Sequence, residues 1–389
     1  MKKTLSLSVM ALLAVSLVLP IVFATSVGSG IGVDVTTEDF PPQVWMCDNR
    51  IVADDNVQWG RITQGSDPIG GTMLERINNY AFEGEKIKWK VLVMDKNKID
   101  QNIDVYATIG DVQGEGNDIE VNCQRVGGNR VEKSCNARIL EEEVEWNPDL
   151  MDYFECTLTV ETPESMYGEY WITVEAEDGD GLLGTMDENE YFFLNPEIRL
   201  SVDGDLTFED VRPGTEAYSD TLLVGNDADD GSGVLMDMFI SGTDFYDSSS
   251  SGARCPSTNQ LALNGVGPNG VRHTGTAIGD DTGFRYFVTN GAYSSYDDLT
   301  VDTQTYDTGT FRAKDTEGYL DIQYGDHWDR TVYDEAEILQ SPVKLGGVYY
   351  AGNILAPGAE MALTFKLDLP EPCNGDFDTG AIYFWGEAI

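Results

Sequence analysis

Apolar positions recur at every second residue along much of the chain. The alternation is clear at 87–91 (IKWKV), 103–105 (IDV), 154–160 (FECTLTV), 198–202 (IRLSV) and 361–367 (MALTFKL). A period of two is typical of antiparallel strands that bury one face and leave the other in water. These segments therefore predict half-buried strands.

Turn signals separate the strand patterns, and the strongest of them lie in the second half of the chain. Asn-Gly pairs, which favour tight hairpin turns, stand at 264–265, 269–270, 290–291 and 374–375. The one segment that predicts a helix is short and runs from about Ala137 to Trp146. Many short strands with almost no helix predict an all-β protein made of antiparallel β-sandwiches.

A change of pattern near residue 196 predicts two sandwich domains. Strand patterns at 170–177 and 191–194 are followed by Asn195-Pro196, which ends the second strand, and a fresh alternation begins at Ile198. The second half also contains long Gly-, Ser- and Asp-rich loops. We therefore divide the chain into a signal peptide at 1–24, an extended segment at 25–45, a first sandwich at 46–195 and a second sandwich at 196–389.

The first residues have the pattern of a secretory signal peptide. Lys2 and Lys3 precede an apolar stretch at 5–23, and Val22-Phe23-Ala24 places small or compact residues at a cleavage site. A retained membrane anchor is the alternative, since the stretch is nearly long enough to span a bilayer. We expect cleavage after Ala24, and therefore an extracellular protein.

An even number of cysteines in an exported chain predicts disulfides. Cys255 and Cys373 are the only cysteines after residue 196, so we expect them to pair with each other. The remaining four pair among themselves in one of three ways that the sequence leaves open: Cys47, Cys123, Cys135 and Cys156.

The charge of the chain is strongly negative. It has 68 Asp and Glu against 24 Lys and Arg, a formal net charge of −44, and loss of Lys2 and Lys3 with the signal peptide makes this −46. Nucleic acid and anionic lipid surfaces are therefore not expected as partners. A salt-rich habitat, calcium binding and simple solubility all fit such a charge.

Two Asp-rich loops are candidate calcium sites, because Ca²⁺ prefers six to eight oxygen ligands that such loops supply. The candidate ligands are Asp178, Asp180 and Asp187 in one loop, and Asp227, Asp229 and Asp230 in the other. Neither loop has the spacing of an EF-hand. The alternative is that Asp and Gly simply form turns at these positions.

The sequence shows no pattern that predicts an enzyme. It holds no GxSxG, HExxH, P-loop or strand-linked GxGxxG motif, and its only histidines are His273 and His327. His327 lies in Asp326-His-Trp-Asp329, where a loop histidine is a more common interpretation than a general base. Among the tryptophans, Trp328 and Trp385 are the candidates for a ligand or partner surface.

Two segments resemble modules of cell-surface proteins. Residues 166–181 (MYGEYWITVEAEDGDG) resemble the closing hairpin of bacterial and archaeal immunoglobulin-like surface domains, which implies an immunoglobulin-like first sandwich. Residues 206–226 resemble a module found in cell-adhesion sandwiches, envelope proteins and camelysin-type fibre proteins. With its acidity, the chain is similar in style to archaeal S-layer and surface-appendage proteins.

Together these features predict a non-enzymatic extracellular structural protein, S-layer-like or part of a cell envelope, and stabilised by cations. A subunit of an extracellular filament and a calcium-dependent carbohydrate-binding protein are the alternatives. The expected partners are other copies of the chain or other surface proteins, and a glycan is a further candidate.

A candidate assembly strand precedes the first sandwich. Val27, Ile31, Val33 and Val35 alternate with small residues, and Pro41-Pro42 separates this segment from the next strand pattern. The segment can be an edge strand of its own domain, or it can add to the open sheet edge of a neighbouring copy.

Overall fold

The protein is described by a computed structural model, and it divides into two units, Met1–Asp39 and Phe40–Ile389. The described residues are 34–54, 73–76, 78–99, 103–113, 119–136, 145–186, 190–255, 259–261, 263, 284–299, 314–325, 336–345 and 349–389, with the side chains of 48–50, 54 and 73–76 left aside. The predicted signal peptide, together with Val27, Ile31 and Val33, lies outside them. Residues 34–39 are exposed and have no regular secondary structure.

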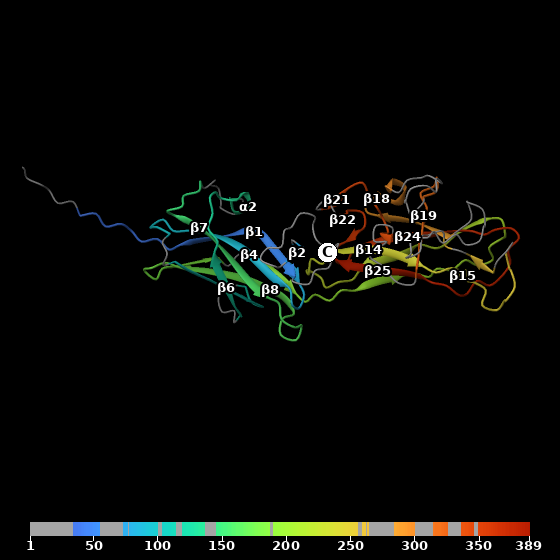
Figure 1. Ribbon diagram of the computed structural model, residues 1–389, viewed down its shortest axis with the longest axis horizontal. Coiled ribbons are helices and arrows are strands. Elements are labelled where there is room, and N and C mark those ends of the chain that lie inside the picture. The colour runs from blue at the N-terminus through green and yellow to red at the C-terminus, as the bar shows by residue number, and fades with distance from the viewer. Residues whose placement is uncertain are drawn as a thin grey trace, which may run out of the picture. The chain divides into compact units, whose positions relative to one another are not determined.

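The first part of the second unit is a ten-stranded sheet (Figure 1). Its strands follow the order β2-β1-β4-β7-β6-β5-β8-β10-β3, and β9 pairs with β8. Their bounds are β1 (Gln43–Asp54), β2 (Met73–Arg76), β3 (Tyr80–Ala81), β4 (Lys86–Met94), β5 (Asp104–Gly110), β6 (Ile119–Arg125), β7 (Met151–Thr159), β8 (Gly168–Glu177), β9 (Leu183–Met186) and β10 (Tyr191–Leu194).

This sheet folds over on itself around one apolar core. Ile87, Trp89 and Val91 of β4 are fully buried, as their alternation predicts, and the lysines between them face the other side. Trp89 packs against Phe192 of β10, with ring centroids 6.0 Å apart. Since β4 and β10 lie far apart in the strand order, the two ends of the sheet must face each other as the layers of a sandwich.

The following part contains a seven-stranded and a four-stranded sheet. The larger has β11 (Leu200–Asp203), β12 (Glu216–Tyr218), β13 (Leu222–Asn226), β17 (Phe284–Asn290), β18 (Tyr293–Ser294), β19 (Leu320–Asp321) and β24 (Glu360–Asp368). The smaller has β14 (Met236–Gly242), β20 (Gln323–Tyr324), β23 (Ile354–Leu355) and β25 (Ile382–Ala388). Two short hairpin-like pairs are β15 (Phe245–Tyr246) with β16 (Gln260–Leu261), and β21 (Lys344–Leu345) with β22 (Tyr349–Tyr350).

The two larger sheets of this part share a second core. Met238 and Ile240 of β14 lie in one buried cluster with Tyr286 of β17 and Phe365 of β24. Burial of this many apolar side chains from both sheets is the main favourable term for a second sandwich.

The all-β fold predicted from the sequence is confirmed. The helical prediction is less accurate: α2 covers only Lys133–Asn136, Glu145 and Trp146 are not helical, and the rest of that segment lies outside the described residues. The pairs β3–β10 and β14–β20 are parallel, so the sheets are not purely antiparallel. The domain border at residue 196 and the immunoglobulin-like class of the first sandwich stay predictions. No helix in the described part of the chain is long and apolar enough to cross a membrane.

Three disulfides use all six cysteines. Cys255 joins Cys373, the pair selected from the sequence. Cys47 of β1 joins Cys135 of α2, and Cys123 joins Cys156, which is its direct cross-strand neighbour in the β6–β7 pair. Each bridge restricts the unfolded chain, with an expected gain of about 2–4 kcal/mol.

A close backbone contact at Gly184 of β9 generates the first testable prediction. A Cβ atom at this position would lie 1.7 Å from the carbonyl oxygen of Pro42, so the backbone just before β1 would have to shift. We expect Gly184→Ala to lower the free energy of unfolding by about 1–3 kcal/mol in urea titrations. Gly252→Ala is the matched control, since its added Cβ has no neighbour within 4 Å. Equal midpoints for both variants would show that β9 does not pack on Pro42.

Candidate functional site

The first predicted calcium loop is a hydrogen-bonded turn between β8 and β9. The Oδ1 atom of Asp178 accepts the backbone N–H groups of Asp180 (2.9 Å) and Leu182 (2.8 Å). Asp315 repeats this geometry, with Oδ1 accepting from Glu317 N (2.9 Å) and Tyr319 N (2.8 Å). One Asp178 oxygen therefore organises the loop. Asp187 lies outside the described residues.

The second predicted calcium loop contacts the first sandwich. Asp229 Oδ2 accepts hydrogen bonds from Tyr167 Oη (2.9 Å) and from the backbone N–H of Glu197 (2.9 Å). Asp227 and Asp230 are exposed beside it. Asp229 therefore already holds two donors that connect residues before and after the predicted domain border.

Further hydrogen bonds surround this contact. Tyr191 Oη donates to the carbonyl of Gly231 (3.3 Å), and Asn78 Nδ2 donates to the carbonyl of Gly233 (3.3 Å). Tyr80, which is fully buried, donates to the carbonyl oxygen of Ile389. We call residues 227–233 together with these partners the junction. Its buried tyrosine and several polar contacts favour a fixed connection over a free hinge.

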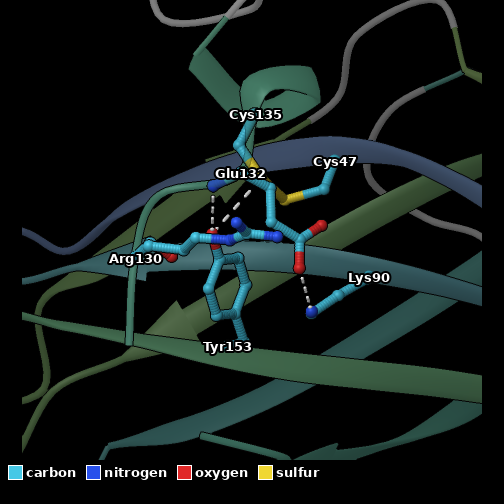
Figure 2. The surroundings of a disulfide bond; sticks show 6 residues. All are labelled: Cys47, Lys90, Arg130, Glu132, Cys135 and Tyr153. Carbon is cyan, nitrogen blue, oxygen red and sulfur yellow. Dashed lines mark hydrogen bonds and ion pairs between the residues drawn. A yellow bond between two sulfur atoms is a disulfide. The ribbon is translucent and has the colours of Figure 1, made fainter. Parts of the chain in front are cut away.

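A second candidate site lies beside the Cys47–Cys135 disulfide, shown in Figure 2. Tyr153 of β7 donates to the carbonyl of Arg130 (3.1 Å), and its oxygen accepts from the backbone N–H of Glu132 (2.8 Å). Lys90 of β4 bonds Glu132 (2.5 Å) and lies 4.2 Å from the centre of the Tyr153 ring. Burial raises the pKa of Tyr153 further above its ordinary value, which already keeps the hydroxyl protonated at neutral pH.

A groove runs next to this cluster, and we call it the β4 groove. It is made of two hollows of about 290 and 480 Å³ that share Lys90, Val126 and Gly127. Lys88, one of its lining residues, bonds Glu155 (3.3 Å), while Arg130 is exposed and has no ion pair among the described residues. The groove can therefore accept one anionic group at Arg130, but its lysines are already neutralised.

A cluster of linked ion pairs lies on one face of the seven-stranded sheet, and among the described residues it is the largest of its kind. Lys366 of β24 contacts Glu216 (3.2 Å), Asp315 (3.4 Å) and Glu317 (3.1 Å), and Arg285 of β17 contacts Asp321 (2.8 Å). Burial acts to lower the pKa of Lys366, but the bonds to Glu317 and Glu216 outweigh it and raise that pKa. Two cations thus hold several carboxylates from separate segments on one face.

Asp368 of β24 is a further carboxylate beside this cluster. Burial raises the pKa of its carboxyl to about 6, although the charge of Lys366 acts in the opposite direction. Its neighbour Glu216, which faces it across the β12–β24 pair, adds repulsion. At neutral pH Asp368 is therefore an ionised group that the fold disfavours.

A pocket of about 460 Å³ lies on the opposite side of β24 from this cluster, and its lining includes Leu367 of β24 and four phenylalanines. These are Phe208, Phe245, Phe284 and Phe377. Its size lies within the range of small-molecule sites. Nothing in its lining supplies a nucleophile with an adjacent base.

The remaining sequence candidates are spread over the structure. Trp385 is half-buried on β25, where its indole N–H donates to Ser241 Oγ (3.2 Å), and its ring lies 6.3 Å from that of Tyr383. His273, His327 and Trp328 lie outside the described residues. Within the ranges described above, no three His, Cys, Asp or Glu side chains come together as potential metal ligands. Calcium binding by the Asp loops stays a prediction.

The calcium prediction can be separated from general screening. We expect thermal unfolding to shift upward in calcium more than in sodium chloride of equal ionic strength. Asp178→Asn with Asp180→Asn should remove the excess, while the turn survives because an asparagine Oδ1 accepts the same N–H groups. Asp227→Asn with Asp230→Asn tests the second loop and leaves the Asp229 contacts intact. If the unfolding temperature of the wild-type chain shifts equally in both salts, general charge screening alone explains the stabilisation.

The charged cluster predicts a pH dependence. A raised carboxyl pKa means that the folded state binds a proton more tightly, so this contribution is complete below about pH 4 and is lost as pH rises through 6. Asp368→Asn should therefore stabilise the protein at pH 8, by no more than about 1 kcal/mol because the group is partly solvated. The gain should vanish at pH 4. A gain that is equal at both pH values would contradict the assignment.

Comparisons with known proteins identify no family. No family model and no curated protein matches the chain. Among solved structures, the C-terminal domain of the AgI/II polypeptide BspA of Streptococcus agalactiae aligns at 11% identity over 90% of this chain and 97% of that one, with a TM-score of 0.27. A putative secreted protein of Eubacterium rectale aligns at 8% identity over 94% and 98%, with a TM-score of 0.20. At these TM-scores, neither alignment supports a conclusion about function.

Proposed function

We propose that this protein is a non-enzymatic structural component of a cell exterior, S-layer-like or part of an envelope. The observation that carries the proposal is the use of all six cysteines in three disulfides within an all-β chain. Such bonds form and persist in oxidising compartments outside the cytosol. The signal-peptide pattern at residues 1–24 agrees with this placement.

The construction of the folded unit also suits a structural role. Disulfides fasten β1 to α2 and β6 to β7, and the junction adds hydrogen bonds from Tyr80, Tyr167 and Tyr191. Covalent and hydrogen-bonded links of this kind hold the linked segments in fixed positions, as a structural role requires. The high negative charge keeps single copies soluble until salt or bound cations screen it.

A filament subunit is the second candidate, because β25 is a strand with one open edge in the described structure. A calcium-dependent carbohydrate-binding protein is the third, and only the Asp loops and Trp385 favour it. The three differ in assembly: an envelope component forms lattices, a filament subunit forms fibres, and a lectin stays a single particle that binds glycans.

Negative-stain microscopy and sedimentation of residues 25–389, in chelator, in calcium and in matched sodium chloride, test the proposal. We expect ordered lattices or sheets in at least one salt condition and single particles in chelator. Surface biotinylation of intact source cells should label the protein. Single particles under all conditions, or labelling only after lysis, would overturn the structural role, and binding of glycans by those particles would support the lectin instead.

A further inference from the structure

The part of β25 from Ile382 to Gly386 has one side on which the described residues place no strand. On its other side it pairs with β14. Its sequence, IYFWGEA, contains one charged residue and no proline. Charged residues and prolines are the usual means by which edge strands avoid pairing with another chain, so β25 is a weakly protected edge.

The register shows which groups of β25 are available. Thr243 N donates to Ala381 O (2.9 Å) and Ile389 N donates to Leu235 O (2.9 Å), and both pairs follow the β14–β25 register. Hydrogen-bonded pairs alternate along an antiparallel ladder, so the odd-numbered residues of β25 bond to β14. The N–H and C=O groups of Ile382, Phe384 and Gly386 therefore point away from β14, along the open edge.

The side chains of β25 also differ between its two faces. Ile382 and Phe384 pack against the core of the second sandwich, while Tyr383 and Trp385 lie on the opposite face beside Ser241. All four are half-buried. A strand added at this edge would extend the apolar face next to Ile382 and Phe384 and would cover part of both aromatic rings.

We propose that β25 accepts the N-terminal segment Val27–Val35 of a second copy of this chain as an added β-strand. The proposal rests on the proposed structural function and gives it a specific contact. In this mode, main-chain hydrogen bonds supply affinity and alternate side chains of the added strand fill positions on one face.

The charge of the chain favours this occupant. Within Val27–Val35 only Asp34 has a charged side chain, in a mature chain with a net charge of −46, and β25 contributes only Glu387. Most other surfaces of two copies would bring carboxylates together, which costs free energy at short range. A strand with one carboxylate, Asp34, and an edge with one carboxylate, Glu387, keep that repulsion small.

The shape of the segment also fits. Val27, Ile31, Val33 and Val35 present one bulky face, and Gly28, Gly30 and Gly32 leave space on the other. Glycines in a strand are covered well by aromatic residues on the neighbouring strand, which Tyr383 and Trp385 can provide. Met1–Asp39 forms a unit of its own, and Val35, its last bulky position, is 75% exposed.

Hydrogen exchange on the mature chain tests the proposal directly. Assembled and single-particle samples from the same preparation are compared by mass spectrometry of peptides that contain residues 381–387. We expect the outward amides of Ile382, Phe384 and Gly386 to exchange roughly tenfold more slowly in assemblies. Assemblies in which β25 exchanges as fast as in single particles would overturn strand addition and leave the structural function standing. Absence of assembly in every salt would overturn both.

Two variants locate the contact from each side. Ile382→Pro removes an outward N–H at the first residue of the edge strand, where proline is tolerated, and Ile198→Pro is the control at an exposed isoleucine elsewhere. Ile31→Asp with Val33→Asp places charges in the donor segment and leaves Phe40–Ile389 unchanged. We expect the Ile382→Pro variant and the donor-segment variant to lose both assembly and the slow exchange of β25. The Ile198→Pro control should keep both.

A folded donor variant that still assembles with a protected β25 would contradict the proposal. A second result would also contradict it: β25 exchanges slowly in wild-type single particles, and the donor substitutions abolish this slow exchange. The segment would then pair with β25 of its own copy. If Ile382→Pro does not fold, the donor variant and the exchange measurement still decide between these results.

Discussion

The excess of acidic side chains is the constraint on which the rest of the structure depends. A chain with 68 carboxylates and 24 basic residues repels itself as it compacts. In the structure, one basic side chain can pair with several acidic ones: Lys366 forms ion pairs with Glu216, Asp315 and Glu317. The structure also uses carboxylates as acceptors for backbone N–H groups, as at Asp178. Two buried apolar cores then supply the driving force that the charges oppose.

Local patterns explain how much of this fold the sequence could predict. The alternation in β4 and β24 records which side of a strand is buried, so both strands were predictable. In β25 every residue from Ile382 to Trp385 is apolar and half-buried, so no alternation marks it, and only its strand-forming residues after Gly380 could have indicated it. Trp385 was identified as a surface candidate, but its position on an open edge needed the sheet.

The contacts that position the candidate sites are non-local, and this is why sequence alone could not provide them. Cys123 pairs with Cys156 because β6 lies beside β7, and nothing in their spacing selects that register. The sequence indicated that Asp229 forms a turn or binds calcium. In the structure its side-chain oxygen accepts a hydrogen bond from Tyr167, which lies 62 positions earlier in the chain. Cys255 and Cys373 were an exception, because the predicted border left no other partner for either.

The same acidity that stabilises separate copies in solution makes contact between them selective. At physiological ionic strength, charges are screened beyond about 8 Å, so repulsion acts mainly where two surfaces touch. Specificity is a difference between affinities, and like charges at incorrect contacts raise that difference without any improvement of the correct one. A weakly protected edge such as β25 is normally an aggregation hazard. In this chain the large excess of carboxylates opposes close contact between most surfaces of two copies, which favours segments with few acidic residues as partners for β25.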